Sequence, residues 1–392
     1  MLRIANHLAF CGHQVYLDIS SEYRQYADNG VVCLDSKFII YKNTGLRPEM
    51  DNADGLYYFA DGLLSCRREY IKDISFYRKN IRPDLILYDA YASWGKQIAR
   101  ALNVPYISSV TMQPFALEAM LDTENGHSEY MSINSRQLKL LRKYEKLLQM
   151  KYFDAAPVPF SEMIYAKGMR NFVYTHRELC MHYELLDCSY CFLGPLIDHQ
   201  SMEIQDSVPM YEPRQEIIFI SFGTILSQPK LLGRCIDALQ NMPYTLYISA
   251  GAAAEDLRSR YTRPGIHIRQ NQDQLELLGK SRLFITHAGH NSVTESIYCG
   301  VPMLAIPQAT DGYFNARMIE TLGLGKYLEI SATRDEIRKS ALSVMNDKGI
   351  KVHADRASQQ LRRMNAMEEI LMIIDHEITA GSIRKAGINN AL

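Results

Sequence analysis

Five polar or glycine residues lie close together after a buried strand in the C-terminal half of the chain. They are His287, Gly289, Asn291, Ser292 and Glu295. The apolar run Leu283–Thr286 predicts the strand, and residues 291–299 have helical spacing and stop at Gly300, as many helices do. Backbone amides at the start of a helix bind phosphate, and small hydroxyl side chains assist them. This segment is therefore a candidate phosphate site.

Two further loops follow strands that we expect in the same sheet. Asp311 comes after the strand 301–306, and its carboxylate can accept hydrogen bonds from sugar hydroxyls but would bind phosphate poorly without a metal. Gly223 and Thr224 follow the strand Ile217–Ser221 and could approach a phosphate, although this loop taken alone favours a tight structural turn. Because ligands of parallel sheets bind at the carboxyl ends of the strands, the three loops predict one crevice. Its ligand would have a phosphate end and a polyhydroxyl end.

Strand-like apolar runs alternate with amphipathic helix-like segments along the chain. The expected strands include Val15–Ile19, 85–87, Tyr106–Val110, Ile217–Ser221, 246–249, Leu283–Thr286 and 303–306, and the expected helices include Ser93–Leu102, 230–239 and 292–299. Alternation of this kind indicates an α/β fold in which helices cover both faces of parallel sheets. A length of 392 residues exceeds that of one ordinary core and predicts two such domains.

The boundary between the two domains is expected in a polar stretch. Residues 198–215 contain two prolines and show no periodic pattern, so we interpret them as a linker. The N-terminal domain would then comprise residues 1–197 and the C-terminal domain residues 216–392. Residues 351–379 have the apolar spacing of a long helix. That helix either packs on its own domain or crosses back to brace the first, and the sequence leaves both arrangements open.

Composition and charge exclude several classes of protein. A formal net charge of −1 provides no general attraction for nucleic acid or an anionic membrane. No apolar run has the length needed to span a bilayer, and no hydrophobic signal block opens the chain. We therefore expect a cytoplasmic protein whose eight cysteines are free thiols.

One group of cysteines with a histidine raises the alternative of a zinc site. It consists of Cys180, His182, Cys188 and Cys191. The last two form a Cys-x-x-Cys pair, but no second matching pair follows, and Cys191 lies in an apolar, strand-like run. We therefore favour buried thiols and expect no metal site.

The polar segments taken together resemble the donor-binding signature of the family 1 glycosyltransferases. The match consists of His287-x-Gly289-x-Asn291-Ser292-x-x-Glu295, then Gly300-Val301-Pro302, Pro307 and Asp311, with further matches at Ser221-Phe222-Gly223-Thr224, Gln274-Leu275-Glu276-Leu277-Leu278 and Phe192-x-Gly194-Pro195. These are GT-B enzymes that use UDP-sugars, among them the bacterial macrolide and antibiotic glycosyltransferases. The resemblance implies two Rossmann-like, doubly wound domains that face a central cleft.

The resemblance also implies a role for each matched residue. Those expected to hold the diphosphate are His287, Ser292, Thr224 and the helix amides near Asn291. Those expected to hold the nucleoside and the transferred sugar are Gln274, Glu295 and Asp311, with Glu295 on the ribose and Asp311 on the sugar. Plainer interpretations are a strand-end histidine for His287 and a loop cap for Asp311. The UDP-sugar is a substrate, so the resemblance implies no cofactor and no metal.

Two positions depart from the family pattern. The family usually has an aromatic residue that stacks on uracil where this chain has Asn271, and a glutamine after the sugar-binding aspartate where this chain has Gly312. Base stacking and sugar recognition are therefore both expected to differ. UDP is the favoured nucleotide, with TDP as the alternative, and the sugar stays open.

The mechanism that the resemblance implies inverts the anomeric centre. A histidine acts as general base, and an aspartate orients it. Asp89 follows a strand and precedes a helix, so it matches that aspartate, while a helix N-cap is an equally good interpretation. In the family the histidine follows the first strand, whereas Leu2 matches the body of the first helix. His7 and His13 match structural positions and do not replace the base.

The resemblance thus implies that the first strand of the N-terminal domain and its loop are missing. In a doubly wound sheet this strand is central, so its loss would leave unpaired backbone groups between its neighbours. Three explanations compete: a start site placed too late, a truncated inactive copy, and a folded non-catalytic relative. We favour the first.

The leading hypothesis is an enzyme that transfers a hexose from a UDP-sugar to a hydroxyl group of a small apolar acceptor, by inversion and without a metal. The runner-up is a degenerate relative that binds the nucleotide-sugar without catalysis. The donor signature disfavours a third hypothesis, a sugar-nucleotide epimerase of GT-B fold. The expected partners are the donor and the acceptor, without nucleic acid and without stable membrane insertion. Residues that could line the acceptor site, although they more often belong to a core, are Met112, Phe115, Met120 and Tyr130.

Overall fold

The chain folds into two compact units. The computed structural model describes residues 1–37, 52–114, 135–153, 160–197, 216–223, 228–308 and 310–389. The first unit comprises Met1–Tyr174, His182–Leu196 and Asn365–Leu392, and the second comprises Thr175–Met181 and Ile197–Met364. The division differs from the expected one in that residues 175–181 and Ile197 join the second unit. The C-terminal segment joins the first unit, which is one of the two arrangements that the sequence left open. The expected linker, 198–215, lies outside the described residues.

The second unit contains a six-stranded parallel sheet with the strand order β12-β11-β10-β7-β8-β9. Its strands are β7 (Ile217–Ser221), β8 (Thr245–Ser249), β9 (Ile266–Arg269), β10 (Leu283–Thr286), β11 (Met303–Ala305) and β12 (Gly325–Tyr327). Successive side chains of β10 enter different cores: Leu283 and Ile285 pack in one cluster, and Phe284 packs in the other. Because both faces are buried, the strands are continuously apolar rather than alternating.

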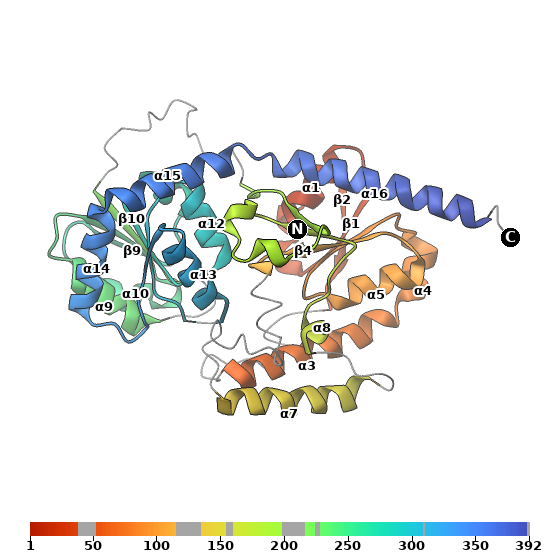
Figure 1. Ribbon diagram of the computed structural model, residues 1–392, viewed down its shortest axis with the longest axis horizontal. Helices are drawn as coiled ribbons and strands as arrows, with labels where there is room; N and C mark the ends of the chain where they lie inside the picture. The colour runs from red at the N-terminus through yellow and green to blue at the C-terminus, as the bar shows by residue number, and fades with distance from the viewer. Residues whose placement is uncertain are drawn as a thin grey trace. The chain divides into compact units, whose positions relative to one another are not determined.

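Helices cover both faces of this sheet (Figure 1). They are α9 (Pro229–Leu239), α10 (Ala254–Arg260), α11 (Gln274–Lys280), α12 (His290–Tyr298), α13 (Thr310–Thr321), α14 (Arg334–Asn346) and α15 (Lys348–Arg362). Figure 1 shows α9 and α14 on one side of the strands and α12 and α13 on the other. Local sequence fixes several helix starts: Thr333 and Glu336 form a capping box at α14, and the Asp347 carboxylate accepts hydrogen bonds from the first amides of α15.

The strands of the first unit form two separate sheets among the described residues. One pairs β1 (Val15–Ile19) with β2 (Val31–Asp35), and the other has the order β3-β4-β5-β6. The strands of the second sheet are β3 (Ile86–Asp89), β4 (Tyr106–Val110), β5 (Arg170–Val173) and β6 (Tyr190–Phe192), all parallel. The helices are α1 (Leu2–Phe10), α3 (Asn52–Ile71), α4 (Ile74–Phe76), α5 (Ser93–Leu102), α7 (Ser135–Tyr152), α8 (Phe160–Ile164) and α16 (Ala366–Asn389).

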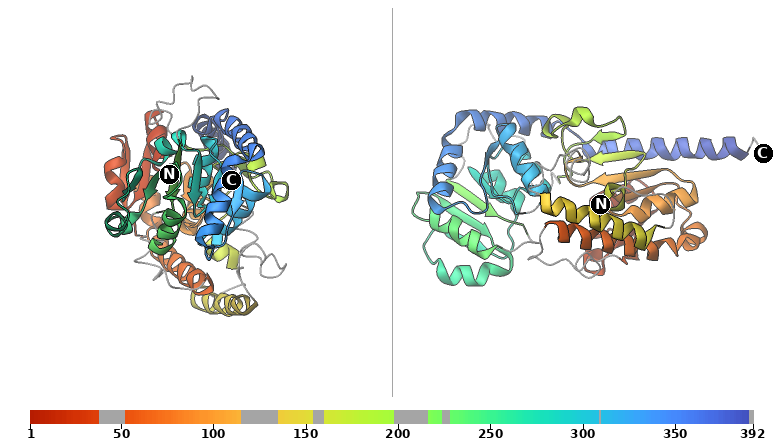
Figure 2. Two further views of the ribbon diagram at one scale, coloured as in Figure 1. Left: turned by 90° about the vertical axis from the view of Figure 1, so that its left-hand side faces the viewer. Right: turned by 60° about the horizontal axis from the view of Figure 1, so that its bottom comes forward.

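Two long helices of the first unit, α3 and α7, lie side by side (Figures 1 and 2). Their contact is partly polar, because the Tyr152 hydroxyl donates to Asp61 Oδ1 at 2.9 Å and Lys151 Nζ lies 2.6 Å from the same oxygen. Met112 belongs to the apolar core beneath them and is 6% exposed. The other three residues considered for an acceptor site, Phe115, Met120 and Tyr130, lie outside the described residues.

The C-terminal helix α16 packs on the first unit, although it follows the second unit in the chain. Ile370 and Ile374 share a core with Ile107 of β4. Arg170 Nε donates to Glu377 Oε1 at 2.9 Å, and the Glu377 side chain is 6% exposed. The single helix expected over residues 351–379 is wrong, because residues 363–365 separate α15 from α16. The break lets the two helices belong to different units.

The cysteines are free thiols with differing exposure. Cys180 is buried and Cys191 is half-buried, whereas Cys188 is exposed, so the expectation that this group is buried is wrong for Cys188. In the described part of the chain, no group of three or more cysteine, histidine or acidic side chains has the arrangement of a metal site. None of the helices described there combines the length and apolar character that a membrane-spanning segment needs.

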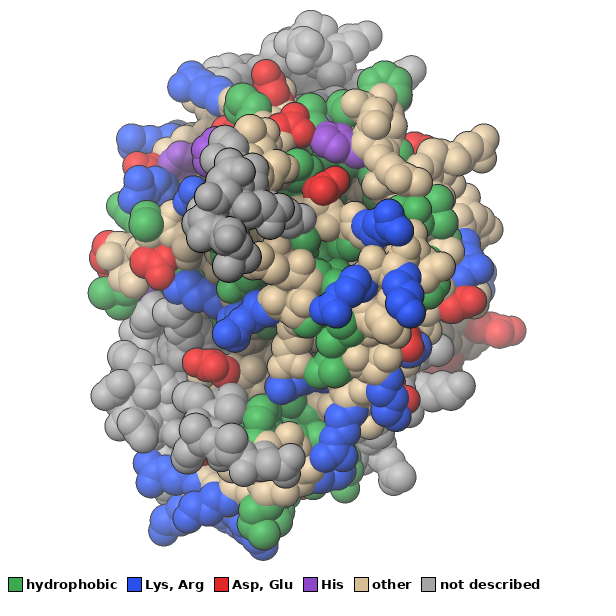
Figure 3. Space-filling view, turned by 90° about the vertical axis from the view of Figure 1, so that its right-hand side faces the viewer, with side chains coloured by type: hydrophobic (Ala, Val, Ile, Leu, Met, Phe, Trp, Pro, Cys, Tyr) green, Lys and Arg blue, Asp and Glu red, His purple; other side chains and the backbone are tan. Residues whose placement is uncertain are grey.

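The face of the protein shown in Figure 3 carries acidic and basic side chains, with hydrophobic and other side chains among them. Such mixing agrees with the formal net charge of −1. Recognition of an anionic ligand therefore depends on local groups.

Candidate functional site

The turn between β10 and α12 has an unusual backbone. Ala288 has a φ of +62°, in the left-handed region that costs an ordinary L-residue about 1–2 kcal/mol. Two side chains hold it there: Thr286 Oγ1 accepts a hydrogen bond from the Ala288 amide at 3.2 Å, and Asn315 Nδ2 donates to the Ala288 carbonyl at 2.8 Å. Asn315 is buried on α13. The turn therefore depends on a residue that lies far along the sequence from the segment it stabilises.

Two glycines make room for the His287 imidazole. A Cβ atom on Gly289 would lie 2.5 Å from His287 Nε2, and one on Gly223 would lie 2.9 Å from His287 Cε1. Gly223 also has a φ of +78°, which favours glycine independently. In the structure, the group that Gly223 closely approaches is the His287 imidazole. The expected approach of Gly223 to a phosphate stays a prediction. Gly312, at one of the two departures from the family pattern, allows another close approach, since a Cβ there would lie 2.7 Å from the His287 carbonyl oxygen.

Helix α12 begins beside this imidazole. It starts at His290, one residue before the predicted start, and its N-cap Gly289 has no side chain to occupy the first amides. The first amides of a helix lack acceptors within the helix and carry a partial positive charge. Asn291 is exposed and Ser292 is half-buried at this end. The arrangement presents amide groups, a hydroxyl and an imidazole together, which suits a phosphate oxygen.

Three of the predicted site residues form one hydrogen-bonded group. Gln274 Nε2 donates to Glu295 Oε2 at 2.6 Å and lies 3.1 Å from Ser292 Oγ. Gln274 is the first residue of α11, and the Asp273 carboxylate caps that helix by accepting from the Glu276 amide at 3.0 Å. The cap therefore fixes where the Gln274 side chain leaves the backbone. Gln274 and Glu295, 21 positions apart in sequence, meet one turn along α12 from its start.

Two predicted donor residues have no described side-chain geometry. Thr224 lies outside the described residues, and of Asp311 the structure gives the backbone, in the first turn of α13, but not the side chain. Asn271, at the other departure from the family pattern, is exposed. It precedes the residues that lead into α11 and offers an amide where the family pattern has an aromatic ring.

His290 and Asn315 are two residues of this region that the sequence analysis missed. His290 is 6% exposed, and its burial lowers the pKa of the imidazole to about 4. Its Nε2 has no hydrogen-bond partner among the described residues. Because the neutral form dominates near pH 7, His290 adds no positive charge at this end of the helix. The positive charge there comes from the amides and from other groups. The sequence offered one signal for His290, because a polar residue directly after Gly289 lies at the start of the candidate phosphate site. Nothing in the sequence indicated Asn315.

Asp89 of the first unit lies at the last position of β3. It is not the N-cap of α5, since Ala92 occupies that position without a side-chain cap. The carboxylate instead accepts a hydrogen bond from the Tyr91 amide at 3.0 Å. Its pKa is raised, chiefly because the surrounding protein desolvates the charge, while the Tyr91 amide and the amino group of Met1 act in the opposite direction. The helix-cap interpretation is therefore wrong, and Asp89 is a carboxylate with perturbed acidity at a strand end.

Comparisons with known proteins agree on one family. Residues 203–368 match the family described as "UDP-glucoronosyl and UDP-glucosyl transferase". The chain is 29% identical to the NDP-glycosyltransferase YjiC of Bacillus subtilis over 273 residues, which span 67% of this chain and 64% of that protein. It is 24% identical to the oleandomycin glycosyltransferase of Streptomyces antibioticus over 401 residues, which span 99% of this chain and 90% of that protein.

Solved structures show the same fold. The glycosyltransferase of kitacinnamycin superimposes with a TM-score of 0.74 at 18% identity, with 96% of this chain and 95% of that chain covered. The calicheamicin glycosyltransferase CalG4 superimposes with a TM-score of 0.73 at 17% identity, with 96% and 94% covered. The architecture therefore extends over nearly all of the chain, beyond the segment that the family pattern matches.

Proposed function

Because this chain belongs to the family 1 glycosyltransferases of GT-B fold, we propose that it transfers a hexose from a UDP-sugar to a hydroxyl group of a small apolar acceptor. The relatives named above are glycosyltransferases, and the bacterial one with the longest alignment is named for an antibiotic. The proposal for the donor rests on the second unit, and the proposal for the acceptor rests on the relatives.

The observation that carries the proposal is the geometry at the start of α12. An uncapped helix N-terminus lies next to an imidazole that two glycines accommodate, and the Gln274–Glu295 pair lies one turn further along. Phosphate oxygens are suited to the amides, and the carboxylate of Glu295 is suited to ribose hydroxyls, which are hydrogen-bond donors. A nucleoside diphosphate carries both kinds of group, phosphate oxygens and ribose hydroxyls, in one molecule.

The chemistry follows from where charge develops. The acceptor hydroxyl oxygen attacks the anomeric carbon, the bond from that carbon to the diphosphate oxygen breaks, and the configuration inverts. The departing UDP gains negative charge, which the amides of α12 and the His287 imidazole stabilise. The acceptor proton goes to a general base. In the mechanism that the family resemblance implies, this base is a histidine that the sequence analysis expects to be missing here, and Asp89 matches the aspartate that orients it and stabilises its protonated form. No cofactor takes part in this scheme.

The decisive experiment incubates the full chain with UDP-glucose and a panel of small apolar alcohols and phenols, and analyses the products by mass spectrometry. We expect an acceptor with one added hexose and an equal amount of UDP. TDP-glucose in a parallel incubation tests the nucleotide, with the UDP donor expected to react faster. Tight UDP binding without transfer or donor hydrolysis would instead identify a nucleotide-sugar-binding protein without catalytic activity.

A further inference from the structure

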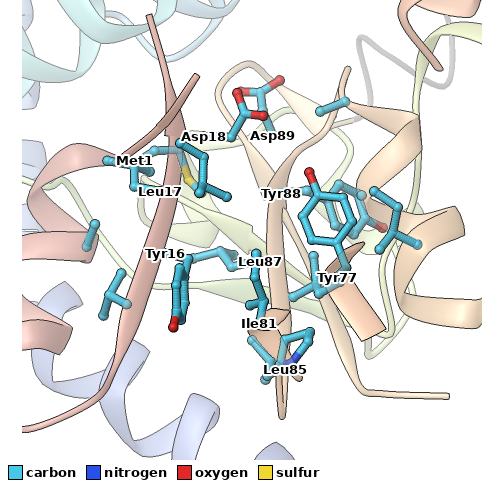
Figure 4. A pocket seen from close by; sticks show the side chains of 18 of the residues that line it. Met1, Tyr16, Leu17, Asp18, Tyr77, Ile81, Leu85, Leu87, Tyr88 and Asp89 are labelled. Carbon is cyan, nitrogen blue, oxygen red and sulfur yellow. The ribbon is translucent and has the colours of Figure 1, made fainter. Parts of the chain in front are cut away.

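The cavity of the first unit has a structural explanation. It has a volume of about 530 Å³ and lies between β1 and β3, with Leu17 on one wall and Leu87 on the other (Figure 4). This is the place of the central strand that the family resemblance implies to be missing ahead of Leu2. A missing strand accounts for the space, so the cavity indicates no further ligand.

An unusual side chain of the second unit follows the end of β11. The amide nitrogen Nε2 and the amide oxygen Oε1 of Gln308 are both covered by protein, and neither has a hydrogen-bond partner among the described residues. Buried amide groups are nearly always paired, because an unpaired donor or acceptor loses its hydrogen bonds to water without replacement. The residue as a whole is half-buried, so a core does not enclose it. Gln308 therefore has hydrogen-bonding capacity that the described part of the protein leaves unused.

Gln308 lies at the carboxyl end of the sheet that carries the donor site. Its strand, β11, is the neighbour of β10, and the Ile306 amide donates at 2.8 Å to the carbonyl of the residue that precedes His287. The next residue, Pro307, lies beside Gly312, since a Cβ atom on Gly312 would be 3.3 Å from Pro307 Cβ. The Gln308 side chain therefore starts from the same group of strand ends as the candidate phosphate site.

The position where the family pattern has a glutamine cannot hold one in this backbone. A Cβ atom on Gly312 would lie 2.7 Å from the backbone carbonyl oxygen of His287, closer than real Cβ atoms come. A side chain at position 312 would therefore have to displace the end of β10. The chain thus lacks the amide that the family pattern supplies there, while Gln308, four positions earlier, has an amide without a partner among the described residues.

An amide side chain suits a pair of sugar hydroxyl groups. Nε2 donates two hydrogen bonds and Oε1 accepts two, whereas each hydroxyl group both donates and accepts. A planar amide can therefore bind hydroxyl groups on two neighbouring ring carbons, one through each of its atoms. A sugar that lacks one of these hydroxyl groups leaves part of the amide unpaired, and sites of this kind discriminate strongly against such analogues.

We propose that Gln308 is a specificity-determining residue of the donor site, and that its amide binds two neighbouring hydroxyl groups of the transferred hexose. The inference rests on the proposed function, because it needs a nucleotide-sugar at the start of α12. The covered amide turns toward the sugar when the donor binds, and this reorientation is favoured because the amide gains the partners that it lacks without ligand. The preferred donors are therefore hexoses with adjacent hydroxyl groups rather than deoxy sugars.

The test measures binding of UDP and of UDP-glucose to the full chain by calorimetry. Gln308→Leu removes the amide at similar volume. In this variant we expect the dissociation constant for UDP-glucose to rise at least about tenfold and that for UDP to stay within twofold, since UDP lacks the sugar. Gln359→Leu, at an exposed position of α15, should change neither value. An equal rise for UDP and UDP-glucose in Gln308→Leu would overturn the assignment.

Selection of hydroxyl groups is tested with analogues of UDP-glucose that lack the hydroxyl group at C2, C3 or C4, one at a time. In the unmodified chain we expect two adjacent deletions to weaken binding about fivefold each, and in Gln308→Leu we expect the same deletions to weaken it less than twofold. Equal losses in both proteins would overturn the role of Gln308 and leave the donor site in place. Absence of UDP binding by the folded, unmodified chain would overturn the proposed function as well.

Discussion

Gln274 Nε2 lies 2.6 Å from Glu295 Oε2, and this bond ties the start of α11 to the first turns of α12. The pair matters for binding because the ribose hydroxyls of a nucleoside would donate to the Glu295 carboxylate, which already accepts a hydrogen bond from the Gln274 amide. The Glu295 carboxylate has room for a second donor, since a carboxylate offers about four acceptor positions.

Removal of this carboxylate should weaken nucleotide binding. For Glu295→Ala we expect the dissociation constant for UDP to rise by roughly 10- to 100-fold, which corresponds to the loss of one or two hydrogen bonds to a charged acceptor. Calorimetry with UDP gives the value directly. Glu295→Gln keeps the shape and one acceptor and should lose less affinity. An unchanged affinity in Glu295→Ala would place the nucleotide elsewhere.

A methyl group added at either of the two glycines around His287 should change UDP binding by displacing the His287 imidazole. Gly289 has a φ of −62°, so Gly289→Ala adds no backbone strain but brings its Cβ to 2.5 Å from Nε2. We expect the imidazole to be displaced and UDP affinity to fall, with nearly unchanged urea unfolding. A crystal structure of this variant with the imidazole unmoved would contradict the expectation.

Gly223→Ala combines strain with collision, and a matched variant separates the two. Gly251 also has a positive φ, of +53°, but a Cβ there meets nothing within 4 Å. Both variants should lose about 1–2 kcal/mol of stability from the left-handed backbone. Only Gly223→Ala should also weaken UDP binding. Urea unfolding and calorimetry on the same two proteins check this, and equal UDP affinities would remove the role of Gly223 at the site.

Asn315 should stabilise the turn rather than contact the ligand. In Asn315→Ala the buried Ala288 carbonyl loses its donor, so we expect a loss of about 1–3 kcal/mol in the free energy of unfolding and weaker UDP binding. In an Ala288→Gly background the left-handed turn is intrinsically accessible, so the same substitution should reduce UDP affinity less. A double-mutant cycle measures this coupling, and strict additivity would exclude it.

The buried His290 imidazole predicts a pH dependence of stability. Its pKa is about 4 in the folded protein and 6.5 unfolded, so between these values the unfolded chain binds more protons. Stability should therefore be complete above pH 6.5 and fall as the pH decreases toward 4, by about 3 kcal/mol in total. His290→Leu should flatten this part of the profile in urea unfolding, whereas replacement of the exposed His376 should leave it. A profile unchanged by His290→Leu would contradict the assignment.

Asp89 should affect turnover and leave donor binding intact. For Asp89→Asn we expect kcat to fall by at least about 100-fold, since an amide cannot stabilise the protonated form of the histidine base that the family mechanism pairs with this aspartate. UDP affinity should stay within twofold of the original by calorimetry, because the donor residues lie in the other unit. Equal kcat values would exclude Asp89 from the reaction.

Much of the local structure could be predicted from the sequence. The strands Val15–Ile19, Tyr106–Val110 and Leu283–Thr286 were placed at their observed bounds, and α12 within one residue of its start. These segments are short apolar runs ended by polar or glycine residues, so burial and backbone preference agree. The spacing from His287 to Glu295 likewise placed residues on a turn and a helix whose geometry is regular.

What could not be predicted depends on contacts between distant segments. The Asn315–Ala288 bond and the burial of His290 arise from packing of α13 and α12, and residue type and spacing indicate neither the bond nor the burial. The break at residues 363–365 is short and contains no proline or glycine, so the apolar pattern continued across it. For Asp89, strand-end placement was predictable, but its hydrogen bond to Tyr91 in place of a helix cap was not.

The packing of α16 against α1 and β4 has a consequence for synthesis in the cell. The first unit uses segments from both ends of the chain, whereas the second is nearly contiguous between them. A ribosome therefore completes the second unit before it releases the helix that finishes the first. Until then Ile107 and Phe172 lack their contacts with α16, so the nascent N-terminal half exposes apolar surface of the kind that chaperones bind.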